Sequence, residues 1–220
     1  MTRPKDLAYA LFDFDGVVAD TEPLYLELDR QSMIGLGYEP TMDELRGFVG
    51  KPSDVMAVEL LAKHGITATL EDYRDGRDIG AGIYGNPDLP ASPGIEDLWH
   101  FLRERGVRIG VVSTTPCADL LRALHRLGLL TYADAVVGRE LAARTKPDPD
   151  PYLQGLAALA PNDPQAAARA IVVEDSPSGI AAAKAAGIHV VGYRGASVEQ
   201  DTSEADETCD SFQELIERLR

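Results

Sequence analysis

The stretch LAYALFDFDGVVADT (residues 7–21) decides the fold of this chain. An apolar run stops abruptly at two carboxylates and a glycine, which is typical of a buried strand that presents its last residues at the edge of a sheet. Further apolar runs follow at residues 108–113, 133–138, 170–174 and 189–193, with a short one at 208–209. Helical patterns alternate with them, so the sequence predicts an α/β fold with a parallel, Rossmann-like sheet.

Start and stop signals delimit the helices between these strands. Thr115 and Ser176 each precede a proline and are predicted as helix N-caps, whereas Gly128 and Gly187 are predicted to end the two helices. Apolar residues at helical spacing predict two more helices, beginning near residue 95 and near residue 212.

Residues 21–90 interrupt the alternation, because they contain helical patterns but no strand pattern. The helices are predicted at 24–34, 43–48, 53–64 and 70–83. An all-helical insertion after the first strand predicts a cap domain of residues 21–90 inserted into a core of residues 1–20 and 91–220. Prolines at both ends of the insertion are suitable hinges for a moving lid.

Composition narrows the classes of function. The chain has 220 residues and a formal net charge of −15, which would repel nucleic acids and anionic lipids. Its two cysteines and four histidines show no metal-ligand spacing, and no apolar run has the length of a membrane span. We therefore expect a cytoplasmic protein that binds neither nucleic acid nor membrane. We also expect a monomer, because no long apolar stripe is left unassigned.

The strand ends contain the residues that could perform chemistry. In an open parallel sheet the carboxyl ends of the strands meet at one edge, where ligands bind. Carboxylates end the first and fourth strands, hydroxyls end the second, and an ammonium group follows the third. These residues are Asp13, Asp15, Ser113, Thr114, Lys146, Glu174 and Asp175.

The four segments, in this order, resemble the four motifs of haloacid dehalogenase-like hydrolases. The segments are residues 13–21, Ser113, residues 145–150 (TKPDPD) and residues 174–187 (EDSPSGIAAAKAAG). A helical insertion between the first two motifs resembles the branch that contains beta-phosphoglucomutase and phosphoglycolate phosphatase. The resemblance covers nearly the whole chain and implies phosphoryl chemistry with Mg²⁺ as cofactor.

The resemblance also implies roles for the acidic residues. Phosphoryl transfer needs an in-line nucleophile, neutralisation of charge and a proton donor for the leaving oxygen. Asp13 is the predicted nucleophile that forms an aspartyl-phosphate, and Asp15 is the predicted acid and base. Mg²⁺ prefers oxygen ligands. The predicted ligands are Asp13, the backbone carbonyl of Asp15 and Asp175, with Glu174 as a further candidate.

Substrate contacts are predicted from both the core and the cap. Ser113, helped by the amide of Thr114, would bind a phosphate oxygen, and Lys146 would contact both the phosphate and Asp13 as a point charge. Lys51, in the cap, is a predicted substrate contact. Residues 47–54 are the segment in which we expect specificity to lie.

Several reactions remain to be compared. Asp15 favours phosphoryl chemistry over dehalogenation, because a halide leaving group needs no proton. We expect hydrolysis of a small phosphomonoester, such as a sugar phosphate. A phosphosugar mutase is the second hypothesis, although beta-phosphoglucomutases have a cap histidine where this chain has Tyr25 and an arginine where it has only Lys51. A non-catalytic binding module is the third, but this chain keeps Asp13, Asp15 and Asp175.

Overall fold

The computed structural model describes residues 2–48 and 53–220, and the chain divides into two compact units. One comprises Met1–Asp20 and Pro90–Arg220, and we call it the sheet unit. The other comprises Thr21–Leu89, and we call it the helical unit. The division predicted from the sequence differs from this one by a single residue, at residue 90.

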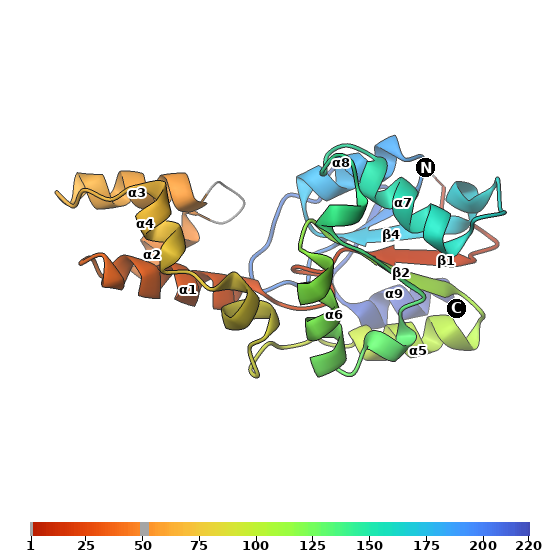
Figure 1. Ribbon diagram of the computed structural model, residues 1–220. Helices are drawn as coiled ribbons and strands as arrows, with labels where there is room; N and C mark the ends of the chain where they lie inside the picture. The colour runs from red at the N-terminus through yellow and green to blue at the C-terminus, as the bar shows by residue number, and fades with distance from the viewer. Residues whose placement is uncertain (1, 49–52) are drawn as a thin grey trace. The chain divides into compact units, whose positions relative to one another are not determined.

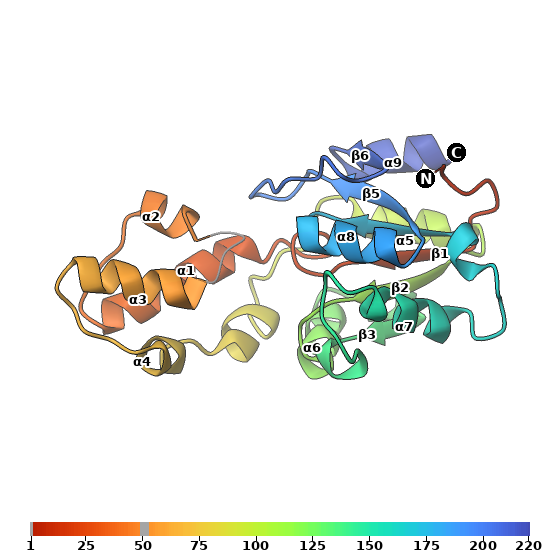
Figure 2. The same ribbon diagram turned by 90° about the horizontal axis from the view of Figure 1, so that it is seen from above.

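The sheet unit contains six parallel strands in the order β3-β2-β1-β4-β5-β6 (Figure 2). The strands are β1 (Tyr9–Phe12), β2 (Arg108–Val112), β3 (Ala135–Val137), β4 (Ala170–Glu174), β5 (His189–Tyr193) and β6 (Glu207–Cys209). The predicted α/β fold is confirmed. Because β2 and β4 flank β1, the direction of winding reverses there, and ligands of such sheets bind at that point beyond the carboxyl ends of the strands.

Helices cover both faces of this sheet (Figure 1). On one face lie α7 (Asp150–Leu159) and α8 (Pro177–Ala185). On the other lie α5 (Ile95–Glu104), α6 (Cys117–Arg126) and α9 (Phe212–Leu219). Strands covered on both sides read as nearly continuous apolar runs rather than alternating, and every residue of β4 and β5 is buried.

Helix α7 was not predicted from the sequence. It follows the proline-rich segment at 145–149, and Pro151 lies in its first turn, where a missing backbone N–H costs nothing. Gly155 brings the helix close to the sheet, because a Cβ at that position would lie 2.9 Å from side-chain atoms of Leu11 and Val112. The side chain of Tyr152, on the same helix, is fully buried in this core.

The two predicted N-caps have different outcomes. Ser176 caps α8 as predicted, since its hydroxyl accepts a hydrogen bond from the Gly179 amide at 3.1 Å. The prediction for Thr115 is wrong, because α6 begins at Cys117 and has no side-chain cap. The Thr115 hydroxyl instead donates to Asp15 Oδ2 at 3.2 Å.

The helical unit contains α1 (Glu22–Gly35), α2 (Met42–Arg46), α3 (Ser53–Lys63), α4 (Leu70–Asp75) and a π-helical turn η1 (Gly80–Tyr84). The single helix predicted at 70–83 is wrong, because α4 ends at Asp75. The chain turns at Gly76 against α1, where a Cβ would lie only 2.7 Å from Ser32 Oγ. Across the described residues, no helix combines the length and the apolar character that crossing a membrane requires.

Candidate active site

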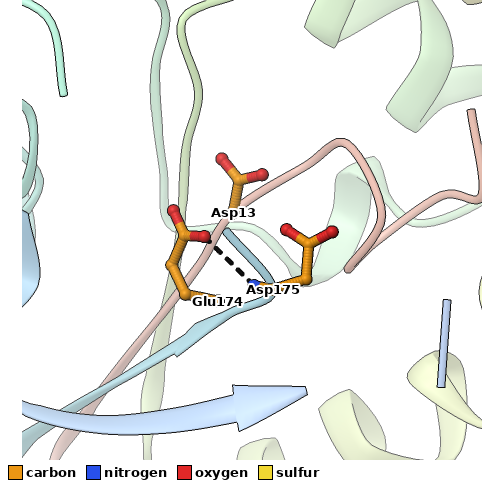
Figure 3. A group of neighbouring side chains, drawn as sticks. All are labelled: Asp13, Glu174 and Asp175. Atoms are coloured by element: carbon orange, nitrogen blue, oxygen red, sulfur yellow. Dashed lines mark hydrogen bonds between the residues drawn. The ribbon is translucent and has the colours of Figure 1, made fainter. Parts of the chain in front are cut away.

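Asp13 lies at the first position after β1. Its backbone amide donates to Val173 O at 3.0 Å, so pairing with β4 continues to this residue and fixes its backbone. Its side chain meets those of Glu174 and Asp175 at the end of β4 (Figure 3). One carboxylate oxygen from each of the three lies within 4.8 Å of the others, so predicted motifs one and four converge.

The charges of this cluster favour a bound cation. Burial raises the pKa of Asp13 to about 7, and Glu174 and Asp15 add to the rise against the opposing effect of Lys146. Burial, followed by Glu174 and Asp13, raises the pKa of Asp175 to about 8. A metal ion bound to the oxygens of such crowded, buried carboxylates offsets the free-energy cost of keeping them ionised. A hard, oxygen-preferring ion such as Mg²⁺ fits this donor set, with Asp13 and Asp175 as the candidate ligands.

Lys146 supplies the positive charge inside the cluster. Its ammonium nitrogen lies 2.5 Å from Asp13 Oδ1, 2.7 Å from Glu174 Oε1 and 3.1 Å from Val112 O. Its side chain is only 5% exposed. Burial by itself would lower the pKa of Lys146, but Asp13 and Glu174 raise it by more, so the group stays charged. The structure thus brings Lys146 to Asp13, as the sequence predicts.

Glu174 is fully buried, and both of its carboxylate oxygens accept hydrogen bonds. Oε1 accepts from Lys146 and from the Tyr152 hydroxyl at 2.8 Å. Oε2 accepts from the amides of Asp175 and Ser176 at 3.1 and 3.0 Å, and from the Ser176 hydroxyl at 2.9 Å. Although burial opposes ionisation, Lys146 and these donors lower the pKa of Glu174. These contacts favour an anchoring role for Glu174 more than the direct metal binding considered from the sequence.

Two glycines make room for the acidic side chains. Gly16 has a φ of 81°, and a Cβ there would overlap the Asp175 carboxyl group. Gly179 lies inside α8. A Cβ at Gly179 would overlap the Glu174 carboxyl group, so its function is to leave space rather than to allow an unusual backbone conformation.

The hydroxyls at the end of β2 contact Asp15. Ser113 Oγ donates to Asp15 Oδ2 at 3.3 Å, and Thr115 Oγ1 donates to the same oxygen at 3.2 Å. The Thr115 amide in turn donates to Ser113 Oγ at 3.0 Å. Thr114 is exposed, and Lys51 lies outside the described residues. Motif two therefore meets motif one through Asp15.

Sequence reasoning missed two further residues at the site. Tyr152 donates to Glu174 from α7, and Gln200 Nε2 donates to Asp175 Oδ2 at 3.1 Å from the loop after β5. In the same loop, Ser197 Oγ donates to Asp20 Oδ1 at 2.8 Å. A helical pattern around residue 152 was the available signal for Tyr152. We find no sequence signal for Gln200, because a loop glutamine is an ordinary surface residue.

The chain is similar to known proteins over most of its length. The family model described as haloacid dehalogenase-like hydrolase matches residues 10–193. A phosphorylated carbohydrates phosphatase of Thermotoga maritima is 32% identical over 180 residues, which is 81% of each chain. Validoxylamine A 7'-phosphate phosphatase of Streptomyces hygroscopicus subsp. limoneus is 33% identical over 204 residues, or 90% of each chain.

A solved structure from Thermotoga maritima, described as a candidate beta-phosphoglucomutase, has a similar fold. It has a TM-score of 0.79 and 28% identity, and the match covers 97% of this chain and 98% of the other. The family model spans most of the present chain. Residues of all four motifs contact one another beyond the ends of the strands. The chain therefore belongs to the haloacid dehalogenase-like hydrolases.

Proposed function

We propose that this hydrolase is a Mg²⁺-dependent phosphatase that hydrolyses a small phosphomonoester through an aspartyl-phosphate on Asp13. The principal support is the buried contact between Lys146 Nζ and Asp13 Oδ1, at 2.5 Å, within a cluster of three carboxylates. The Lys146 ammonium opposes the rise that burial causes in the pKa of Asp13, and so favours the ionised, nucleophilic form of this carboxylate. Bound Mg²⁺ would reduce the repulsion between that carboxylate and an incoming phosphate.

The proposed reaction has two steps. An oxygen of Asp13 attacks phosphorus while the bond from phosphorus to the ester oxygen breaks, and Asp15 gives its proton to the departing alkoxide. Asp15 then takes a proton from water, and this water attacks the aspartyl-phosphate. The products are an alcohol, inorganic phosphate and regenerated Asp13, with one water consumed.

Ser113 and Lys146 are the proposed phosphate-binding groups. Both already contact the two aspartates that react, because Ser113 donates to Asp15 and Lys146 to Asp13. Each can donate to a phosphoryl oxygen beside these carboxylates. Donors that lie beside the reacting groups before the reaction can stabilise the charge that develops in the transition state.

The relatives favour a carbohydrate-like substrate. One is named for phosphorylated carbohydrates and another for validoxylamine A 7'-phosphate. We therefore propose a sugar phosphate or a similar small metabolite as the substrate of this chain.

The test is phosphate release from a panel of sugar phosphates, phosphoglycolate, nucleotides and acetyl phosphate. We expect turnover with Mg²⁺ and none after EDTA treatment. Asp13→Asn should lower kcat by at least about a thousandfold, because the amide cannot replace the nucleophile. Asp97→Asn, which changes an exposed aspartate on α5, is the matched control and should have wild-type activity. Turnover by Asp13→Asn at the wild-type rate would contradict the proposal.

A phosphosugar mutase is the second candidate, favoured by the candidate beta-phosphoglucomutase with a TM-score of 0.79. The side chain at the position of the mutase histidine is Tyr25, whose hydroxyl lies 2.8 Å from that of Tyr84. Conversion of beta-glucose 1-phosphate without net release of phosphate would establish this candidate in place of the phosphatase.

A further inference from the structure

The ammonium of Lys146 has no spare hydrogen-bond donor. A lysine has three N–H groups, and those of Lys146 point to Asp13 Oδ1, Glu174 Oε1 and Val112 O, at 2.5, 2.7 and 3.1 Å. To contact a phosphoryl oxygen, Lys146 must therefore give up or share one of these bonds. The oxygen that it leaves needs another donor, because an unpaired charged oxygen in a buried site is costly.

Tyr152 contacts both members of the Lys146–Glu174 pair. Its hydroxyl donates to Glu174 Oε1 at 2.8 Å, the same oxygen that accepts from Lys146. Its ring centroid lies 4.8 Å from Lys146 Nζ, within the range of a cation–π contact. The side chain is fully buried on α7, which packs against β1 and β2. Burial, with Glu174 and Asp13 nearby, raises the pKa of Tyr152 well above its ordinary value, so the hydroxyl remains a donor.

We propose that Tyr152 is a positioning residue for phosphoryl transfer, and this inference rests on the proposed phosphatase function. Its hydroxyl keeps Glu174 Oε1 hydrogen-bonded. Lys146 can therefore break its own hydrogen bond to Glu174 and donate to a phosphoryl oxygen as negative charge develops there. Its ring keeps the ammonium between Glu174 and Asp13 while this exchange takes place.

The proposal predicts that removing the Tyr152 hydroxyl destabilises the transition state and not the ground state. Without the hydroxyl, Lys146 is the only donor to Glu174 Oε1 among the described residues, and moving it toward the phosphoryl group leaves that oxygen unpaired. An interaction needed only in the transition state changes kcat and leaves KM unchanged. Among the described residues, the Tyr152 hydroxyl donates to Glu174 Oε1 and not to Asp13 or Asp175, the candidate Mg²⁺ ligands, so metal affinity should be retained.

The test uses Tyr152→Phe, which keeps the ring and removes the hydroxyl. Tyr9→Phe is the matched control, because the Tyr9 hydroxyl also donates to a carboxylate, Asp163 Oδ2, at 3.0 Å, but from the opposite end of β1. For Tyr152→Phe we expect kcat to fall about tenfold. KM and the Mg²⁺ dissociation constant measured by calorimetry should stay within about twofold of wild type. Tyr9→Phe should leave all three quantities unchanged.

A second measurement does not depend on turnover. Orthovanadate can adopt the five-coordinate geometry of the transition state, whereas inorganic phosphate cannot. Tyr152→Phe should weaken the binding of orthovanadate about tenfold and leave that of phosphate unchanged, since transition-state analogues report transition-state contacts.

Three results would overturn the proposal. In the first, kcat of Tyr152→Phe stays within about twofold of wild type. In the second, Mg²⁺ affinity falls in proportion to kcat, which would assign Tyr152 to the metal site. In the third, Tyr9→Phe shows an equal loss, which would indicate a general effect on stability. A wild-type enzyme inactive on every phosphate ester would refute the phosphatase function itself, and the role of Tyr152 with it.

Discussion

At the scale of single residues, the site depends on the space and the donors around Glu174. This side chain is fully buried and accepts hydrogen bonds on both oxygens, so its carboxyl group has one position available. Gly179 provides that position by having no side chain. Since Glu174 contacts Lys146, and Lys146 contacts Asp13, a displacement of Glu174 would be transmitted to the proposed nucleophile.

Gly179→Ala should therefore damage both activity and stability. The added methyl group would overlap the Glu174 carboxyl group, and overpacking of this kind costs about 1–3 kcal/mol of unfolding free energy. We expect kcat to fall at least about tenfold as Lys146 and Asp13 shift. Steady-state kinetics and urea unfolding measure the two effects.

Gly35→Ala is the control for this substitution. Gly35 is also helical, at the end of α1, and nothing lies within 4 Å of the Cβ that it would gain. Activity should be unchanged, and stability should be unchanged or higher by up to about 1 kcal/mol, because alanine restricts the unfolded chain. Equal kinetics for the two variants would contradict the role assigned to Gly179.

At the scale of elements, the junction between β4 and α8 combines two functions in three residues. Glu174 ends the strand, Asp175 follows it, and Ser176 caps the helix. The Ser176 hydroxyl accepts from the Gly179 amide at 3.1 Å and donates to Glu174 Oε2 at 2.9 Å. The same hydroxyl therefore caps the helix and fixes the position of Glu174 in the site.

Ser176→Ala should cost both stability and activity. Loss of the N-cap should lower the unfolding free energy by about 1 kcal/mol. Loss of the contact with Glu174 should lower kcat severalfold. Ser211→Ala is the matched control, because Ser211 caps α9 by accepting from the Glu214 amide at 3.2 Å and, within the described residues, its side chain makes no hydrogen bond to the site. It should show a similar loss of stability with unchanged kcat, and a fall in kcat equal to that of Ser176→Ala would refute the second function of Ser176.

At the scale of the whole molecule, the buried carboxylates link metal binding to stability. The pKa values of Asp13 and Asp175, about 7 and about 8, lie above that of an exposed aspartate. The native metal-free protein therefore binds more protons than the unfolded chain above the unfolded pKa of about 4. The stability from these protonated groups is fully present below that pH and is lost as the pH rises through 7 to 8.

The melting temperature of the metal-free protein should consequently fall between pH 6 and pH 9. Each additional proton bound by the native state changes the unfolding free energy by about 1.4 kcal/mol per pH unit. Asp175→Asn, which has no titrating group at this position, should show a shallower fall. Thermal unfolding in EDTA, at constant ionic strength, measures this slope, and a melting temperature that rises over this range would contradict it.

Added Mg²⁺ should raise the melting temperature more at pH 8.5 than at pH 6. The ion competes with protons for the carboxylates, and a ligand present at a hundredfold excess over its Kd contributes about 2.7 kcal/mol. Asp175→Asn should lose most of this increase. An equal increase at both pH values would place the ion elsewhere.

The features that could be predicted from the sequence are those that short segments determine. The apolar run before Asp13, the cap at Ser176 and the glycine after α8 each depend on neighbouring residues, so strand, helix start and helix end follow from local chemistry. The order of these segments predicted a parallel sheet. Because the ends of parallel strands meet at one edge, the sequence also predicted that Asp13, Lys146 and Asp175 come together.

Only the tertiary structure decided which side chains complete the site. The contact of Tyr152 with Glu174 needs α7 packed on the sheet, and the contact of Gln200 with Asp175 needs a loop 25 residues away along the chain. Two other differences from the sequence prediction also depend on partners from another element. Helix α4 ends before Gly76, which lies against Ser32, and Thr115 donates to Asp15 instead of capping a helix. Local sequence determines backbone preferences, but the partners of a buried polar group are determined by packing, because the large majority of such groups find their hydrogen bonds within the folded core.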